Sequence, residues 1–173
     1  MAFITVDGSL EPITSAIDRI TAIGINPTPV LAAIGPYMVA NTQQRMREGI
    51  DPDGVRWEDY APLNPLYAID KPGPSILIGQ GGFARGLAGT LTSQADGSSL
   101  IWGSNKEYAA VHQFGALIQP KSALQLSFVM GGELIHASSV YVPARPYLGF
   151  TEEDRQDVIE ELDDFLTRAM GGR

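Results

Sequence analysis

The sequence predicts an α+β fold: an antiparallel sheet with helices packed on one face, a projecting long β-hairpin and a C-terminal amphipathic helix. Apolar residues recur at three- and four-residue spacing near both ends of the chain, which is typical of one buried helical face. Between these segments lie two hairpin patterns, each centred on a pair of turn residues. Helices and antiparallel strands that are segregated along a chain are typical of α+β domains.

The length and composition of the chain fit one domain over residues 1–173. Single hydrophobic cores are commonly built from roughly 100 to 200 residues. We expect a flexible loop at about 61–86 and a β-hairpin arm at about 122–143.

The charge and the cysteine content exclude several classes of protein. The formal net charge is −8, so the chain lacks the broad basic surface that sequence-independent binding of nucleic acid needs. The sequence has no cysteine, which excludes disulfides and thiolate-bound zinc and fits synthesis in a reducing cytoplasm. It contains no basic, apolar leader and no run of about 18 apolar residues, so neither a signal peptide nor a membrane span is expected.

The first half of the chain is expected to be mainly helical. A short strand over 3–6 precedes a helix that Gly24 ends, and whose buried stripe consists of Leu10, Ile13, Ile17, Ile20 and Ile23. A second helix runs to about Glu48, with Thr28 as its N-cap and Pro29 at its first position. Pro36 should kink or divide this helix, and Gly49 suits a left-handed C-terminal cap.

Turn and loop signals follow the second helix. Residues 51–54 form a tight turn that brings Trp57 into a polar segment, where we interpret it as an anchor. From 61 to 74 four prolines argue against regular structure, and loops of that length are usually functional or flexible.

Two hairpins and a short helix are predicted next. Asp96 and Gly97 form the turn of the first hairpin, which pairs Leu91 with Trp102. Asn105 then caps a short helix over 106–114, which Gly115 ends.

The second hairpin has strands near 123–130 and 133–143 around Gly131 and Gly132. In that register Phe128 faces Ile135 and Leu126 faces Ala137, and the polar residues 125, 127, 136 and 138 lie on the other side, so the ribbon is expected to be apolar on one face only.

The last helix is expected to begin at Thr151, with Asp154 in the place of the usual Glu or Gln of a capping box. Its inner face is formed by Val158, Ile159, Leu162, Phe165, Leu166 and Ala169. The acidic residues are expected on its outer, solvated face.

The sequence lacks the usual catalytic motifs, and we predict no catalytic, cofactor-binding or metal-binding residue. His112 lies four residues after Tyr108 and is interpreted as a packed or interface histidine, and His136 as a solvated or contact residue. No HExxH or His-rich spacing suits zinc, and the glycine-rich run 79–86 lacks the ending of a phosphate-binding loop.

Arg145 has a defined structural role in this interpretation. It lies between Pro143 and Pro146, which hold the backbone extended, so that its guanidinium is expected to make a bidentate contact to a carboxylate. The residues singled out for structural or interaction roles are Trp57, Tyr108, His112, Phe114, Gly115, Gly131, Gly132, Arg145 and Pro146.

Four pieces of the chain, in this order, resemble the phage virion morphogenesis family, which includes tail completion proteins of Mu-like and P2-like phages. The pieces are DPDGVRW at 51–57, IL at 76–77 before a glycine-containing stretch, YAAVHQFG at 108–115 and VPARPYLG at 142–149. The third and fourth pieces together are the most specific. The resemblance spans about 30–166, most of the chain.

The resemblance implies a structural virion protein without catalytic activity, acting in tail completion and head–tail joining at the neck or the head-proximal end of the tail. Such subunits look like members of hexameric rings, so the implied partners are further copies of this chain and other neck and tail proteins: stopper, terminator or tail tube. Nucleic acid would be met only as DNA passing through a ring. The resemblance does not separate tail completion, tail terminator and connector roles.

Two further hypotheses remain open from the sequence. The first is a small hydrolase that acts in virion maturation and depends on His112 and His136. The second is a module that binds a host factor and is dispensable for making particles. The one-sided ribbon and the proline-rich loop are compatible with contacts to a neighbouring subunit in a closed ring.

Overall fold

The structure, a computed structural model, describes residues 11–71, 73, 75–79 and 82–171, so the strand expected over 3–6 lies outside the described residues. In chain order the elements are α1 (Glu11–Ile25), α2 (Thr28–Glu48), α3 (Trp57–Tyr60), α4 (Pro65–Asp70), α5 (Gly82–Arg85), the 3₁₀ helix η1 (Ala88–Thr90), β1 (Leu91–Asp96), β2 (Ser99–Ser104), α6 (Ala109–Phe114), β3 (Ala116–Ile118), β4 (Leu126–Met130), β5 (Glu133–Ala137), β6 (Val140–Val142) and α7 (Glu152–Gly171). The α+β class is confirmed.

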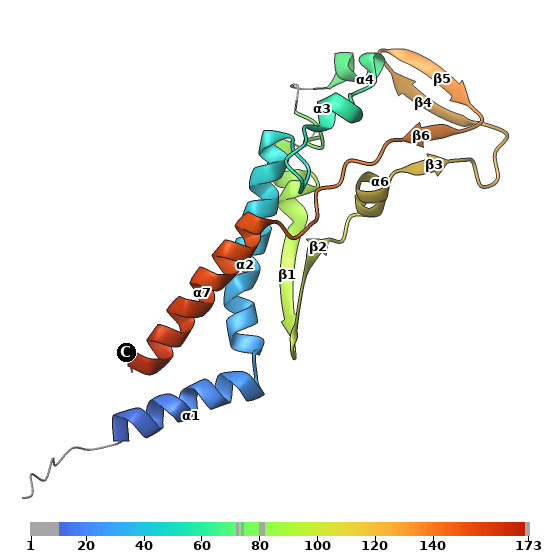
Figure 1. Cartoon of the computed structure of the whole chain (residues 1–173). Coiled ribbons are helices and arrows are strands. Elements are labelled where there is room, and N and C mark those ends of the chain that lie inside the picture. Colours follow the sequence, from blue (N-terminus) through green and yellow to red (C-terminus); the bar gives the residue numbers. More distant parts are fainter. Residues whose placement is uncertain (1–10, 72, 74, 80–81, 172–173) are drawn as a thin grey trace, which may run out of the picture.

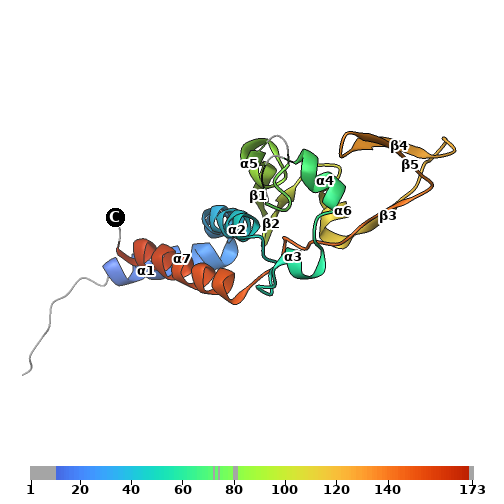
Figure 2. The same cartoon turned by 90° about the horizontal axis from the view of Figure 1, so that it is seen from above.

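The strands form three antiparallel two-stranded sheets, β1–β2, β3–β6 and β4–β5, where the sequence predicted one sheet. Helix α2 is the centre of the helical part, with the β1–β2 hairpin along one side and α7 along the other (Figure 1). Helix α1 packs against α7 at the end farthest from β3–β6, and the β3–β6 and β4–β5 sheets extend to the opposite side (Figures 1 and 2).

Two hydrophobic clusters hold these elements together. The first joins α2 to its neighbours, with a buried centre of Val30, Ile34 and Met38 and half-buried partners Ile23, Leu100, Trp102, Val158 and Phe165. The second lies where the motif segments meet and consists of Met46, Trp57, Ile76, Leu87, Ala88, Leu91, Ala109 and Tyr147. Gly35 permits the close contact between α2 and β1, because a Cβ there would lie 2.5 Å from the hydroxyl oxygen of Ser93.

The ends of α2 confirm one prediction and correct another. Gly49 adopts the left-handed conformation (φ 75°) and its N–H bonds to the Arg45 carbonyl, as expected of a C-terminal cap. Thr28 is not the N-cap: it is the first helical residue, and its hydroxyl donates to the Gly97 carbonyl at 3.0 Å. The helix continues through Pro36, which therefore does not divide it.

The first hairpin has a different register from the predicted one. Leu91 pairs with Ser104, not with Trp102, and Asp96 pairs with Ser99, so Gly97 and Ser98 form the turn. Gly97 has φ +55° while Ser98 is not left-handed, and glycine at the first turn position is typical of a type II′ turn. The shift of two residues leaves the inward and outward faces unchanged, because side chains alternate along a strand.

The second hairpin has the predicted register. Leu126 pairs with Ala137 and Phe128 with Ile135, and Gly131 and Gly132 both have positive φ, as a type I′ turn requires. Its second strand is shorter than predicted: it ends at Ala137, and the next residues form β6, which pairs with β3.

The outer face of this ribbon is not purely polar. Val129 and Leu134 pair with each other there, 67% and 63% exposed. The expectation that the ribbon is apolar on one face only is therefore wrong.

The arm, defined here as residues 116–142, folds back on itself. Strand β3 runs outward, β4 returns, β5 runs outward again and β6 returns, so that the Gly131 turn lies beside α4 (Figure 1). The backbone N–H of Gly131 donates to Asp70 Oδ2, and a Cβ at Gly131 would meet Leu66. The outermost part of the arm is thus the loop 119–125, where Leu124 is 98% exposed.

The proline-rich segment contains regular structure that the sequence did not predict. Pro65 is the first residue of α4, and Asn64 caps this helix by accepting a hydrogen bond from the Leu66 N–H at 2.9 Å. Proline is favoured at the first helical position, because its missing N–H would have no partner there. The prediction of a segment without regular structure over 61–74 is therefore wrong.

Helix α7 begins with the predicted cap. The Thr151 hydroxyl accepts from the Asp154 N–H at 3.1 Å, and Asp154 Oδ2 accepts from the Thr151 N–H at 2.9 Å. The prediction that all acidic side chains of this helix face solvent is wrong, because Asp154 and Glu161 are buried.

The inner faces of the two outer helices are narrower than predicted. Ile159 and Leu162 of α7 are exposed, as are Ile17 and Ile20 of α1, whereas the sequence placed all four in buried stripes. Leu10 lies outside the described residues. Among the described helices none is long and apolar enough by itself to cross a membrane, although Ile17–Ile25 and Thr28–Glu48, bent by 71°, reach that length and composition together.

Candidate functional site

The segment 142–149 is the meeting point of the sequence motifs. It runs from β6 towards α7 and lies between α3 and α6 (Figure 1). Trp57 of the first motif is fully buried and its Nε1–H donates to the Pro146 carbonyl at 3.0 Å. The same segment meets the turn before Trp57, because a Cβ at Gly149 would lie 2.5 Å from the Pro52 ring. Trp57 thus connects the first motif to the segment 142–149.

Gln113 connects the two most specific motifs. Its Oε1 accepts from the N–H groups of Tyr147 and Leu148, both at 3.0 Å, and its Nε2 donates to the Leu148 carbonyl at 2.9 Å. One side chain on α6 thus satisfies three backbone groups of a segment that pairs with no described strand there. Gln113 lies within the motif at 108–115, but the sequence analysis predicted no role for it.

The end of α6 is tied to the same segment through the backbone. The Arg145 N–H donates to the His112 carbonyl at 2.7 Å. Gly115 has φ 72° and ψ 163°, and a Cβ there would lie 2.9 Å from the Ala144 nitrogen. Only glycine adopts this conformation readily and leaves room for the neighbouring chain, so the predicted structural role of Gly115 has a physical basis.

Arg145 is buried, but its partners are not the predicted carboxylate. Nε donates to the Ala61 carbonyl and Nη2 to the Pro62 carbonyl, both at 2.8 Å. Burial lowers the pKa of this guanidinium, although arginine stays charged at any physiological pH. The guanidinium fixes the backbone before α4, while its charge has no carboxylate partner among the described residues.

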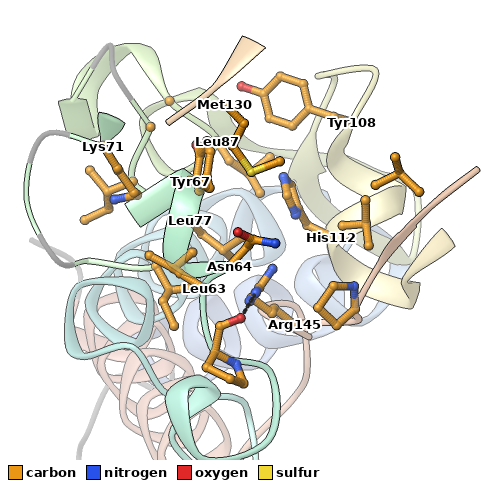
Figure 3. A pocket seen from close by; sticks show the side chains of 18 of the residues that line it. Leu63, Asn64, Tyr67, Lys71, Leu77, Leu87, Tyr108, His112, Met130 and Arg145 are labelled. Atoms are coloured by element: carbon orange, nitrogen blue, oxygen red, sulfur yellow. Dashed lines mark hydrogen bonds between the residues drawn. The ribbon is translucent and has the colours of Figure 1, made fainter. Parts of the chain in front are cut away.

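Beside Arg145 lies a cavity of about 730 Å³, here called the Arg145 pocket (Figure 3). Its walls come from the segment before and within α4, from 76–79, from α6, from the tip of the β4–β5 hairpin at Met130 and from β6. The lining is mostly apolar. Four side chains bring nitrogen atoms to it: Asn64, Lys71, His112 and Arg145.

Lys71 and His112 have no acidic partner in this pocket among the residues that the structure describes. Lys71 is buried, and its ammonium donates to the carbonyls of Gly73, at 3.3 Å, and Ser75. Burial lowers the pKa of Lys71. Burial and then the Arg145 charge lower the pKa of His112, which favours the neutral imidazole near pH 7. Tyr108 packs edge-on against the His112 ring, with centroids 5.7 Å apart.

The remaining candidates lie apart from the pocket or on its rim. Phe114 points to solvent at the end of α6, with 78% of its surface exposed. Met130 lines the pocket next to the Gly131 and Gly132 turn, and Pro146 contributes the carbonyl that accepts from Trp57. The structure therefore brings Trp57, Arg145 and Pro146 together with His112 and Gly115, and leaves Phe114 at the surface.

The histidines do not form the machinery of a hydrolase among the described residues. His136 Nδ1 lies 2.9 Å from Ser127 Oγ on the exposed ribbon, and no described carboxylate bonds to the ring. His112 Nδ1 is buried without a hydrogen-bond partner in the described part of the chain. Within that part, no cluster of three His, Asp or Glu side chains has the arrangement of a metal site.

The sequence model of the phage virion morphogenesis family matches residues 9–167. The chain belongs to the phage virion morphogenesis family. Its role is in the assembly of a bacteriophage virion.

Two curated relatives of this family member cover most of its length. It is 24% identical over 156 residues to the Mu-like prophage FluMu G protein 2 of Haemophilus influenzae, covering 90% of each chain. It is 29% identical over 139 residues to the putative capsid assembly protein G of Escherichia phage Mu, covering 77% of this chain and 75% of the relative. No solved structure gives a significant match.

Proposed function

We propose that this chain is a non-catalytic structural subunit of the phage neck or head-proximal tail, and that it completes the tail and joins it to the head. The proposal rests on the arm. In the isolated subunit the arm exposes apolar cross-strand pairs, Leu117 with Tyr141 and Val129 with Leu134, and an almost fully exposed Leu124. Contiguous exposed apolar surface on a small protein is typical of contacts with other proteins.

The backbone of the arm supports the same function. Each of its sheets has two strands, so each strand has one edge without a strand partner among the described residues. Free edges of this kind accept a strand from another chain. We propose that further copies of this chain, arranged in a hexameric ring, and the stopper, terminator or tube proteins of the same virion supply the missing contacts.

Electron microscopy of lysates from the parent phage, with this gene inactivated, tests the proposal. Full heads beside separate tails of normal length are the expected result. Tails of irregular length would assign the chain to tail termination instead, and intact infectious particles would refute a role in joining.

A second experiment asks whether the arm carries the function. Replacing Val129 and Leu134 together with serine removes one exposed apolar pair and should abolish complementation of the inactivated gene, without lowering the melting temperature of the purified subunit. Ser127→Ala on the same face is the matched control and should complement fully. Full complementation by the double serine variant would contradict the role of this face.

A double variant distinguishes the maturation hydrolase from the proposed structural function. Replacing both His112 and His136 with glutamine removes any general base that either ring supplies. If a hydrolase were the answer, heads and tails would still join while a processing step failed.

A further inference from the structure

The Arg145 pocket carries a charge opposite to that of the chain around it. The formal net charge of the chain is −8, yet none of the residues that line the pocket is an aspartate or a glutamate. The lining does contain the cations Lys71 and Arg145. A concave, largely apolar surface with a small number of charged groups is the usual form of a binding site, and its volume of about 730 Å³ is typical of one.

Within the described part of the chain, main-chain oxygens are the only hydrogen-bond acceptors of both cations. Arg145 donates to the Ala61 and Pro62 carbonyls, and Lys71 to the Gly73 and Ser75 carbonyls. A carbonyl satisfies a donor, but it does not neutralise a net charge in a low-dielectric site. The ion pairs among the described residues involve neither side chain. The site is therefore complementary to a negative group that the described residues do not provide.

Arg145 also keeps part of its donor capacity free. Nε and Nη2 are used within the chain, whereas Nη1 makes no hydrogen bond to the described residues. Figure 3 shows the guanidinium in the middle of the pocket, with the His112 ring and the Asn64 amide beside it. A carboxylate is the natural partner of such a donor, because charge-assisted hydrogen bonds to guanidinium are short and strong.

Strand β6 indicates the shape of the occupant. Val140, Tyr141 and Val142 line the pocket, and β6 has one strand partner among the described residues, β3, on one of its two edges. An extended peptide beside the second edge of a strand gains backbone hydrogen bonds and turns alternate side chains into the adjoining pocket. The apolar walls then accept apolar side chains of that peptide.

We propose that the Arg145 pocket receives an extended segment of another protein of the same virion, with apolar side chains that fill the pocket and one carboxylate that meets Arg145. This inference rests on the proposed function, since it takes the partner from the virion. It adds a site for that partner that includes Tyr141 but is separate from the exposed Val129 and Leu134 pair.

Photo-crosslinking within virions tests the occupant directly. Benzoylphenylalanine in place of Tyr67, which lines the pocket and is 41% exposed, should cross-link to one segment that contains an aspartate or glutamate among apolar residues. Tyr37 is the matched control, because it is a tyrosine of similar exposure, 44%, on α2 and outside the pocket lining. The same segment should not be labelled from position 37.

A synthetic peptide of the cross-linked segment then tests the charge. Changing its Asp or Glu to the amide should weaken binding to the purified subunit about tenfold, because a hydrogen bond to a charged group contributes at least that much. Lys71→Met in the subunit should weaken binding too, whereas Lys121→Met, at an exposed site in the arm loop, should not. Melting curves of both variants show that the fold is retained.

Each failure has a distinct meaning. No cross-link from position 67, a cross-linked segment without a carboxylate, or equal affinity of the acid and amide peptides would overturn the pocket proposal. If the pocket proposal is overturned but heads and tails do not join when the gene is inactivated, the proposed function stands. If particles form without the gene, the proposed function fails whatever the peptide does.

Discussion

Arg45 of α2 and Asp154 of α7 form an ion pair that is closed to solvent. Nη1 of Arg45 lies 3.1 Å from both carboxylate oxygens, and the two side chains are 5% and 0% exposed. Asn41 adds a hydrogen bond to Asp154, and Arg45 Nη2 donates to the Gly149 carbonyl at 3.2 Å. The pair therefore connects the central helix both to the last helix and to the end of the motif segment.

Removing one partner of this pair should destabilise the subunit strongly. Arg45→Ala leaves a buried carboxylate without its cation, which typically costs about 3–5 kcal/mol of unfolding free energy. The matched control is Arg155→Ala, which breaks the exposed pair with Glu152 and should cost about 1 kcal/mol or less. Chemical denaturation of the purified subunits measures both values, and similar losses would contradict the importance of the buried pair.

The same carboxylate predicts how stability depends on pH. Burial alone would raise the pKa of Asp154, but hydrogen bonds from the Thr151 N–H, Arg45 and Asn41 outweigh it and hold the pKa below its ordinary value. A depressed pKa in the folded state stabilises the fold above the pKa of the unfolded chain, and this contribution is lost as pH falls through the folded pKa. Unfolding free energies should therefore decline below about pH 4.

Asp154→Asn tests that assignment. The difference in unfolding free energy between the native chain and this variant should be greatest at neutral pH and should shrink as the pH falls below about 4. A difference that is the same at pH 7 and pH 3 would show that Asp154 does not titrate in this way.

Gln113→Ala should weaken the contact between the motif segments 108–115 and 142–149 and so destabilise the subunit. The change leaves the Tyr147 N–H and both backbone groups of Leu148 without their partner, and we expect a loss of about 2–4 kcal/mol. Gln156→Ala, which removes an exposed contact to Glu160, should stay within about 0.5 kcal/mol. Thermal or chemical unfolding would decide, and a small loss for Gln113→Ala would mean that water replaces these bonds.

Two glycines with positive φ should respond differently to alanine. A Cβ at Gly115 would lie 2.9 Å from the Ala144 nitrogen, whereas one at Gly132 would meet nothing within 4 Å. Gly132→Ala should therefore cost only the left-handed backbone penalty, about 1–2 kcal/mol. Gly115→Ala adds a backbone clash and should cost clearly more. Equal melting temperatures of the two variants would contradict the close packing of α6 on the motif segment.

Local signals predicted the features that depend on neighbouring residues alone. The register of the second hairpin follows from two adjacent glycines, the cap of α7 from Thr151 with an acid three residues later, and the end of α2 from Gly49. The Asn64 and Pro65 pair is also typical of a helix start, but the prediction for 61–74 considered only the density of prolines.

Long-range contacts were beyond the reach of pattern analysis. The acceptors of Arg145 are carbonyls 84 and 83 residues away in the chain, and any of the many carboxylates was an equally good partner on paper. The sequence predicted Asp154 as a helix cap, but it is one of eight acids over 151–173 and nothing in the pattern indicated its contact with Arg45, 109 residues earlier. Lys71 likewise acquires its place in the pocket from segments that come together only in the fold.

In the folded-back arm, the distance that the arm extends from the helices and the length of the β4–β5 hairpin can vary independently. In a single straight hairpin the two would be one length. How far the arm extends from the helices depends on β3, β6 and the loop 119–125 beyond them. The length of β4 and β5 instead decides whether their turn meets Asp70 and Leu66 on α4, and thus whether the arm is braced. Extra residues in the outer loop would change how far the arm extends from the helices, whereas extra residues at Gly131 and Gly132 would disrupt its contact with α4.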